Sequence, residues 1–186
     1  ESWWKVYSRS KRSLSLDFRS EQGREILFKL LETADILSEN FVPGTLEKWD
    51  MGPEELWKHN ENLIITRISG WGQTGPYAKK PGFGSLIEGM SGFASMTGWS
   101  DKPPLLPPLA LADMVAGITG FGGVLAAVIA RMKGEVKGQV IDLSLFEPLF
   151  GVLGPWAANY EATGKVPIRL GNRSDVAAPR NLYPTK

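Results

Sequence analysis

One long uncharged segment constrains the fold of this chain more than any other feature. Residues 114–130 carry no charged side chain and are bounded by Asp113 and Arg131. A helix needs about 17 residues to span a bilayer, but glycines interrupt this segment and no second segment resembles it. We therefore expect a helix that is buried on all sides in a water-soluble core, with no membrane contact. Asp113 then stands at the head of this helix, and its position needs a physical explanation.

The composition is that of an ordinary globular domain without a dominant charge. Of the 186 residues, 42% are hydrophobic and 22% are charged, and the formal net charge is +1. This balance gives no long-range field for nucleic acid or an anionic membrane, so any anion site must be local. The chain has no cysteine, which excludes disulfides, thiolate metal sites and a cysteine nucleophile. The first residues contain no signal-peptide core, and we expect a cytoplasmic protein.

Strand-like and helix-like patterns alternate in the first half of the chain. Helical spacing follows Ser20, which is a suitable N-cap, and a second short helix is expected at 52–60. Alternating or apolar runs predict strands at 13–18, 36–41 and 62–69. Such alternation is typical of parallel β-α-β units, so we predict an α/β fold.

The second half continues this pattern with more helix. We expect a helix of small residues in 85–98, then the long helix described above, then a strand at 139–143. Another helix is expected from Ser144, with a break near Pro155. The tail beyond it has no periodicity, and both ends of the sequence are typical of a piece of a larger protein or of a chain that needs a partner.

Several basic residues stand at predicted strand ends and turns, namely Arg19, Lys48, Lys79 and Lys80. Ligands of open parallel sheets bind beyond the carboxyl ends of the strands, so these side chains could hold phosphates. They could equally be ordinary solvated side chains. The glycine-rich stretches lack the GxGxxG and P-loop spacings, and both tight packing and close approach of a ligand would explain them.

Asp113 has two interpretations that its position alone leaves open. As a helix cap or first-turn acid, it would be stabilised by the positive end of the helix dipole. The same placement keeps a carboxylate ionised and directed outward, as a nucleophile or general base requires. His59 is the only histidine and is expected on the surface, which leaves a Ser-His-Asp triad or a histidine metal site without support.

The order and spacing of these segments resemble the family III CoA-transferases of the CaiB/BaiF type. The segments that carry the resemblance are residues 10–84, "MSGFASMTG" (90–98), "LADMVAG" (111–117) and "KGQVIDLSLFE" (137–147). The resemblance implies a Rossmann-like large domain, with a parallel sheet flanked by helices, in an interlaced homodimer. It also implies transfer of coenzyme A from an acyl-CoA to a small carboxylic acid, with CoA as part of the substrate and with neither a metal nor a redox cofactor.

The resemblance assigns roles to individual residues. The aspartate of "LADMVAG" is the family nucleophile, which is Asp113 here, and it reacts through an acyl anhydride and an aspartyl-CoA thioester. The family positions near the adenine, its phosphates and the rest of the nucleotide correspond to Leu16, Arg19, Lys48 and Trp49. A further basic contact falls on Lys79 or Lys80, and the variable loop length leaves the choice between them open.

Two departures from the family pattern affect this interpretation. Gly82-Phe83-Gly84 stands where the family usually reads Gly-Phe-Asp, so a common acid is missing at position 84. Related acyl-CoA racemases have a histidine where this chain has Phe83, so racemisation by two bases lacks its groups.

The second departure is the extent of the resemblance. Residues 1–186 correspond to the central part of the large domain, without the family's first strand and helix and without its small domain. The alternative hypothesis is therefore a catalytically inactive CoA-binding or self-assembling domain.

Overall fold

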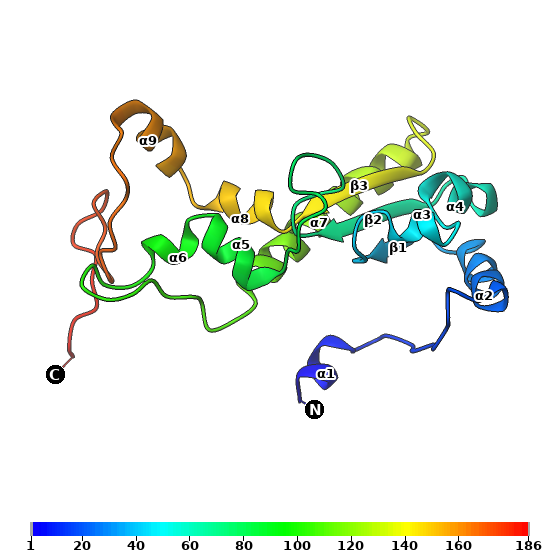
Figure 1. The fold of residues 1–186 in the computed structure, drawn as a ribbon, viewed down its shortest axis with the longest axis horizontal. Helices are drawn as coiled ribbons and strands as arrows, with labels where there is room; N and C mark the ends of the chain where they lie inside the picture. The colour runs from blue at the N-terminus through cyan, green and yellow to red at the C-terminus, as the bar shows by residue number, and fades with distance from the viewer. Residues whose placement is uncertain (1, 186) are drawn as a thin grey trace.

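The computed structural model describes residues 2–185, and its centre is a small parallel sheet (Figure 1). Strands β1 (Ile36–Glu39), β2 (Ile64–Ser69) and β3 (Gln139–Ser144) lie in the order β1-β2-β3. Ile64 of β2 is in register with Ile36 on one side and with Gln139 on the other. The predicted α/β fold with a parallel sheet is confirmed.

Three helices pack around β1 and the start of β2 and form the first core. Ser20 caps α2 (Glu21–Leu31) as predicted, because its hydroxyl accepts the Gly23 N–H at 3.1 Å. Helices α3 (Thr45–Lys48) and α4 (Pro53–His59) follow β1. The buried side chains of this first core are Leu31, Leu46, Met51, Leu56, Leu63 and Ile65.

The second core forms around the long helix α7 (Leu111–Met132). This helix contacts β2 and β3 as well as α5 (Gly84–Met90) and α8 (Phe146–Val152). The buried side chains of this second core are Ile87, Ala112, Ala116, Leu145 and Leu149. The other helices are α1 (Ser2–Tyr7), α6 (Phe93–Met96) and α9 (Trp156–Thr163). Helices α2–α4 and helix α9 with the C-terminal tail lie at opposite ends of the molecule (Figure 1).

The strand predicted at 13–18 is wrong. Residues 11–17 are irregular and lead through a turn into α2, and no ladder hydrogen bond joins them to the sheet. Alternating polarity is not sufficient for a strand, because an isolated extended segment lacks partners for its backbone groups. Only the end of the segment is packed, where Phe18 contacts the rings of Phe41 and Trp49.

The composition of the long helix predicted that it would be buried on all sides, and this prediction is also wrong. One stripe faces the sheet and α5, and it consists of Ala112, Ala116, Gly120 and Ala127. The opposite face exposes large apolar side chains, which are Ile118, Phe121, Leu125, Ile129 and Met132. Within residues 2–185, α7 alone has the length and apolar composition of a membrane span, a property shared by core helices of soluble proteins. A sheet of this width can cover only one face of a helix this long.

The remaining boundaries were predicted well, with two helices divided. The small-residue helix expected in 85–98 is two helices, since Gly92 adopts a positive φ of 93° between α5 and α6. The helix expected from Ser144 also divides, because Gly154 has a φ of 86° and Pro155 follows it. The predicted break near Pro155 is therefore confirmed.

Candidate active site

Asp113 lies in the first turn of α7, two residues after the helix begins at Leu111. The N-cap is Ala110, so Asp113 is a first-turn acid and not the cap itself. Its side chain is exposed, and its negative charge is close to the positive end of the helix dipole. The position therefore presents a carboxyl group to the surroundings of the helix end.

Asp113 borders a cavity at the carboxyl ends of the strands. The cavity has a volume of about 330 Å³ and is lined by Ser38, Glu39, Asn40, Ile68, Asp113, Ala116, Gly117, Leu143 and Leu145. Open parallel sheets bind their ligands at this edge. The polar residues 38–40 were not predicted as part of the site, although their place at the end of a predicted strand was the signal that could have identified them. We call this space the strand-end cavity.

A second cavity lies on the other side of Asp113, beside α5. Its volume is about 450 Å³, and its lining consists of Phe83, Gly84, Ser85, Glu88, Leu106, Pro107, Leu109, Ala110 and Asp113. We call it the α5 cavity. Asp113 thus borders both spaces, so a group bound in either one lies beside its carboxylate.

Gly84 allows the Asp113 carboxylate to lie against the start of α5. A Cβ atom at Gly84 would be 2.7 Å from Asp113 Oδ2, which is closer than real Cβ contacts. A side chain at position 84, such as the acid that the family usually has there, would therefore require the exposed Asp113 carboxylate to turn aside. Glycine at position 84, in place of the usual acid, therefore leaves this space to the Asp113 carboxylate.

Glu88 is a second carboxylate in the α5 cavity, and no pattern in the sequence indicated that it would be buried. Only 3% of its surface is exposed. Its Oε1 accepts the backbone N–H of Ala112 at 3.3 Å, next to Asp113 in the chain. Its other oxygen has no hydrogen-bond partner among residues 2–185.

A buried arginine connects the sheet to α3. The Arg67 guanidinium donates to Glu39 at 2.8 Å and to Glu47 at 2.6 Å. Burial lowers the pKa of Arg67, but the hydrogen bonds to the two glutamates outweigh it and raise the pKa overall. The hydrogen bonds from Arg67 lower the pKa of Glu47. The cluster fixes the position of α3, which carries Lys48 as its exposed last residue.

The structure brings two of the predicted CoA-contact segments together. Trp49 is half-buried, and its ring centroid is 6.3 Å from that of Phe18 and 5.3 Å from that of Phe41. Through these rings, the segment that carries Leu16 and Arg19 is adjacent to the end of α3. Arg19 is exposed and donates to Asp17 at 2.9 Å, and this hydrogen bond lowers the pKa of Asp17.

The two loop lysines have different surroundings. Lys80 Nζ lies 3.8 Å from the centroid of the Tyr77 ring, which is a cation–π contact. Lys79 is exposed and has no such contact or ion pair among residues 2–185. The loop is fixed near its end, where Trp71 Nε1 donates to the carbonyl of Pro81 at 3.0 Å.

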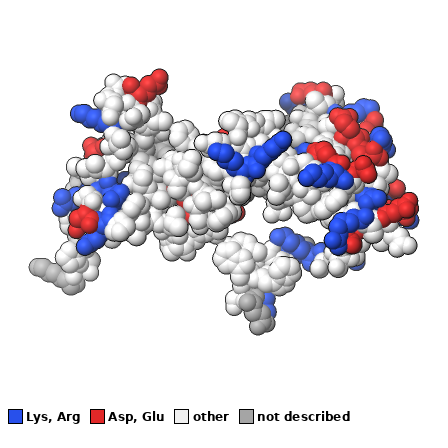
Figure 2. All heavy atoms as spheres, in the orientation of Figure 1, with Lys and Arg blue, Asp and Glu red and all other residues white. Residues whose placement is uncertain are grey.

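The distribution of charged side chains over the surface fits the expectation that any anion site is local. Figure 2 shows side chains of both signs together over α2–α4 and again near the C-terminal end, and the surface between them carries one prominent basic group among mostly uncharged atoms. His59 is exposed, as predicted, and stacks on Phe28 with ring centroids 4.1 Å apart. Within residues 2–185, no group of three or more His, Asp or Glu side chains is arranged to hold a metal ion.

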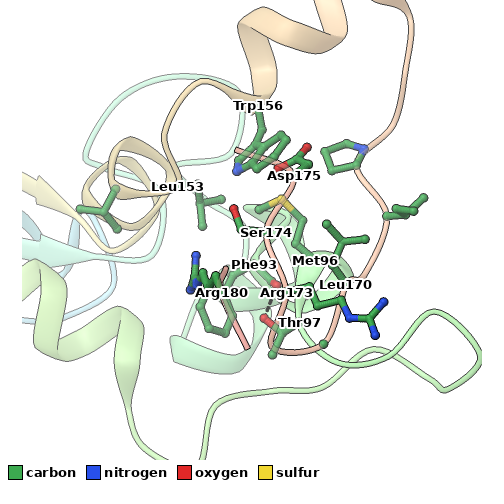
Figure 3. A pocket seen from close by; sticks show the side chains of 14 residues that line it. Phe93, Met96, Thr97, Leu153, Trp156, Leu170, Arg173, Ser174, Asp175 and Arg180 are labelled. Carbon is green, nitrogen blue, oxygen red and sulfur yellow. Dashed lines mark hydrogen bonds between the residues drawn. The ribbon is translucent and has the colours of Figure 1, made fainter. Parts of the chain in front are cut away.

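A third cavity, of about 460 Å³, lies between α6, α9 and the C-terminal tail (Figure 3). Its labelled lining includes the apolar side chains of Phe93, Met96 and Trp156 together with Arg173 and Arg180. Neither Asp113 nor any predicted CoA contact lines it. The candidate site is therefore the pair of cavities that share Asp113.

Comparison with known proteins gives one consistent result. The sequence matches the profile of CoA-transferase family III over residues 1–186. It is 39% identical over 183 residues to a succinyl-CoA–D-citramalate CoA-transferase of Chloroflexus aurantiacus, covering 98% of this chain and 45% of that protein. It is 37% identical over 184 residues to a succinate–glutarate CoA-transferase of Agrobacterium fabrum, covering 99% of this chain and 46% of that protein. The chain thus spans less than half the length of these relatives.

A solved structure gives the same picture. The fold matches the crystal structure of a CaiB/BaiF family protein from Brucella suis with a TM-score of 0.84 and 41% sequence identity. The match covers 91% of this chain and 44% of that one. The arrangement of sheet and helices described above is therefore shared with a protein of that type.

Proposed function

The chain belongs to CoA-transferase family III, and from this premise we propose that the protein transfers coenzyme A from an acyl-CoA to a small carboxylic acid. The observation that carries the proposal is the exposed Asp113 carboxylate between two cavities, at the first turn of α7. Relatives named for succinate, glutarate and oxalate support a small carboxylic acid as the acceptor.

In the first half-reaction, an Asp113 carboxylate oxygen attacks the thioester carbonyl carbon of the acyl-CoA. The carbon–sulfur bond breaks, the CoA thiolate leaves with the electron pair, and an acyl anhydride remains on Asp113. The thiolate then attacks the aspartyl carbonyl carbon of this anhydride. The donor acid leaves as its carboxylate, and Asp113 becomes an aspartyl-CoA thioester.

The second half-reaction reverses these steps with the acceptor. The acceptor carboxylate attacks the aspartyl thioester, forms a new anhydride and releases the CoA thiolate. Attack of the thiolate on the acceptor's acyl carbon gives the new acyl-CoA and restores the Asp113 carboxylate. Each step exchanges one acyl bond for another, so the cycle balances without an external proton, an electron or a redox cofactor.

The CoA nucleotide is proposed to lie along the segments at the end of α3. Arg19 and Lys48, with Lys79 or Lys80, would pair with phosphates as point charges or hydrogen-bond donors. Leu16 and Trp49 would provide apolar contacts for the adenine. The cation–π contact of Lys80 makes Lys79 the lysine that can turn toward a phosphate at lower cost. We further propose a homodimer in the cytoplasm, for which the exposed apolar face of α7 provides contact area.

The test is intact mass spectrometry of the purified protein after incubation with a panel of acyl-CoAs, with and without hydroxylamine. We expect an adduct that maps to Asp113 and that hydroxylamine removes. D113N should abolish the adduct and keep CoA affinity within a few-fold, because the amide has the same shape but is a poor nucleophile. D101N is the matched control, since Asp101 is exposed and remote from both cavities. CoA binding without any adduct would favour the inactive CoA-binding domain instead.

A further inference from the structure

We propose that Glu88 is a positioning residue, which caps α7 from the neighbouring helix α5 and thereby fixes where the Asp113 carboxylate lies. The inference rests on the proposed function, because it assumes that Asp113 attacks a thioester. Asp113 is the third residue of α7, so its backbone belongs to the turn whose N–H groups lack acceptors within the helix. The way this turn is held therefore determines the position of the carboxylate.

The start of α7 has no capping side chain of its own. Its N-cap is Ala110, which makes no side-chain hydrogen bond to the helix. The Leu111 N–H donates to the Leu109 carbonyl at 2.9 Å, and the Met114 N–H donates to the Ala110 carbonyl at 3.0 Å. The N–H of Ala112 lies between these two in the chain. Ala112 is fully buried, so its N–H needs an acceptor from another part of the protein.

Glu88 supplies that acceptor. Its Oε1 accepts the Ala112 N–H at 3.3 Å, and Glu88 itself is only 3% exposed. Both groups are shielded from water, so each depends on the other as a partner. A carboxylate at this place is also favoured by the positive end of the α7 dipole. Glu88 thus does for α7 what an N-cap serine or aspartate usually does, but from a different helix.

A second contact between α5 and the same turn lies one helical turn earlier. Gly84 and Glu88 are four residues apart on α5, so they lie on the same face of that helix. Gly84 leaves room for Asp113, since a Cβ atom there would be 2.7 Å from Oδ2. Ile87 is buried with Ala112 in the second core. Helix α5 therefore holds the backbone of this turn and leaves the Asp113 side chain at the α5 cavity.

The expected consequence of losing this cap is slower attack and not weaker binding. Without an acceptor for the Ala112 N–H, the first turn of α7 opens more readily, and the Asp113 carboxylate spreads over more positions. Small misplacements of a reacting group slow the chemical step. The proposed nucleotide contacts Arg19, Lys48 and Trp49 do not line the α5 cavity, so the affinity for CoA should remain.

The test uses two variants with side chains of similar length, E88Q and E88M. Glutamine has an amide oxygen that can accept the Ala112 N–H, whereas methionine fills the space with a thioether that is only a weak acceptor. Adduct formation on Asp113 is followed by rapid-quench mass spectrometry over a range of acyl-CoA concentrations. We expect E88M to lower the maximal rate by about tenfold or more, with the half-saturating concentration changed by less than about threefold. E88Q should keep the maximal rate within about threefold of the original.

Hydrogen exchange measures the cap without any substrate. The amides of residues 111–114 should exchange about tenfold faster in E88M than in E88Q or the original protein. S91A is the matched control on α5, because Ser91 is 5% exposed and its hydroxyl donates to the Glu88 carbonyl, but it lines neither cavity beside Asp113. It should leave the adduct rate and this exchange unchanged. Thermal unfolding of each variant shows whether the fold is retained.

The outcomes separate the two proposals. If the original protein gives no adduct on Asp113, the proposed function is overturned and this inference with it. If E88M reacts as fast as the original protein, if E88Q is as slow as E88M, or if the amides of 111–114 exchange equally in both variants, the inference alone is overturned. The same holds if S91A slows the reaction as much as E88M does. A maximal rate that is lost in E88M and kept in E88Q supports the inference.

Discussion

The two cores of this molecule differ in that only the second includes small side chains among its buried residues. Around α2–α4 the first core is filled by large residues, among them Met51, Leu56 and Ile65. Around α7 the second core includes Ala112 and Ala116. Large side chains fill the space between elements, whereas small ones let the backbones approach and leave openings where the elements diverge. The openings lie beside Asp113, so the first region provides rigidity and the second provides the site.

The buried arginine joins these two regions. Arg67 is on the central strand, and its partners Glu39 and Glu47 belong to the first region. Glu39 also lines the strand-end cavity that contains Asp113. The first core therefore contributes Glu39 to one wall of the strand-end cavity. Variants of the Arg67 cluster should affect the stability of the fold, whereas variants next to Asp113 should affect activity.

The largest expected effect is that of R67A on stability. Removing the guanidinium leaves Glu39, whose side chain is 3% exposed, as a buried charge without a cation, which costs about 3–5 kcal/mol. The control is K137A, because the Lys137–Glu61 pair is solvent-exposed and such pairs contribute less than about 1 kcal/mol. Urea unfolding followed by tryptophan fluorescence measures both. Equal losses would contradict the view that the buried cluster stabilises the frame.

The next effect concerns a close backbone contact near the site. A Cβ atom at Gly70 would lie 2.5 Å from the Cα of Gly82, so G70A must push the two backbone segments apart. We expect a loss of about 1–3 kcal/mol. G122A on α7 is the matched change, because nothing lies within 4 Å of its added methyl group, and alanine should stabilise the helix by up to about 1 kcal/mol. If G70A and G122A shifted the urea midpoint in the same direction, the close backbone contact of Gly70 would not be what distinguishes the two positions.

The strands and helices could be predicted from the sequence better than the cavities beside Asp113. The β-α alternation identified all three strands of the sheet, and Ser20 was identified as a cap, because these signals are local. The false strand at 13–18 has the correct alternation but no neighbouring strand. Pairing is a property of the whole fold and is not encoded in a short segment.

The site was predicted only in part, for a similar reason. Asp113 was identified by its position at the head of an apolar helix and by the resemblance. Glu88 was missed because its burial depends on the packing of α5 against the start of α7. The hydrogen bond that marks this packing joins Glu88 to Ala112, 24 residues further along the chain. The exposed face of α7 was missed because composition reports how apolar a helix is and not how many of its faces have neighbours.

A smaller effect, on activity alone, is expected from G84A. The added methyl group would displace the Asp113 carboxylate, since its Cβ would be 2.7 Å from Oδ2. We expect adduct formation to slow by about tenfold, equivalent to about 1.4 kcal/mol, because small misplacements of a reacting group are costly. G89A is the control on the same helix, with nothing within 4 Å of the new methyl group. An unchanged adduct rate in G84A would mean that Asp113 reacts from another orientation.

The smallest effect is a pH dependence in the first region. Hydrogen bonds from Arg67 lower the pKa of Glu47 below its usual value of 4.5. A carboxyl whose pKa is lower in the folded state adds stability above its unfolded pKa, and this stability is lost as the pH falls through the folded pKa. E47Q should therefore be less stable than the original protein at pH 7, by less than about 1 kcal/mol because the Glu47 side chain is 45% exposed.

The gap between E47Q and the original protein should close as the pH is lowered from 5 toward 3. Urea midpoints measured at several pH values give this gap directly, and E25Q provides a control at an exposed position on α2. A gap that stays constant across this range would mean that the Glu47 charge is not what Arg67 uses to hold α3. Glu39, the more deeply buried partner, would then be the group on which the position of α3 and Lys48 depends.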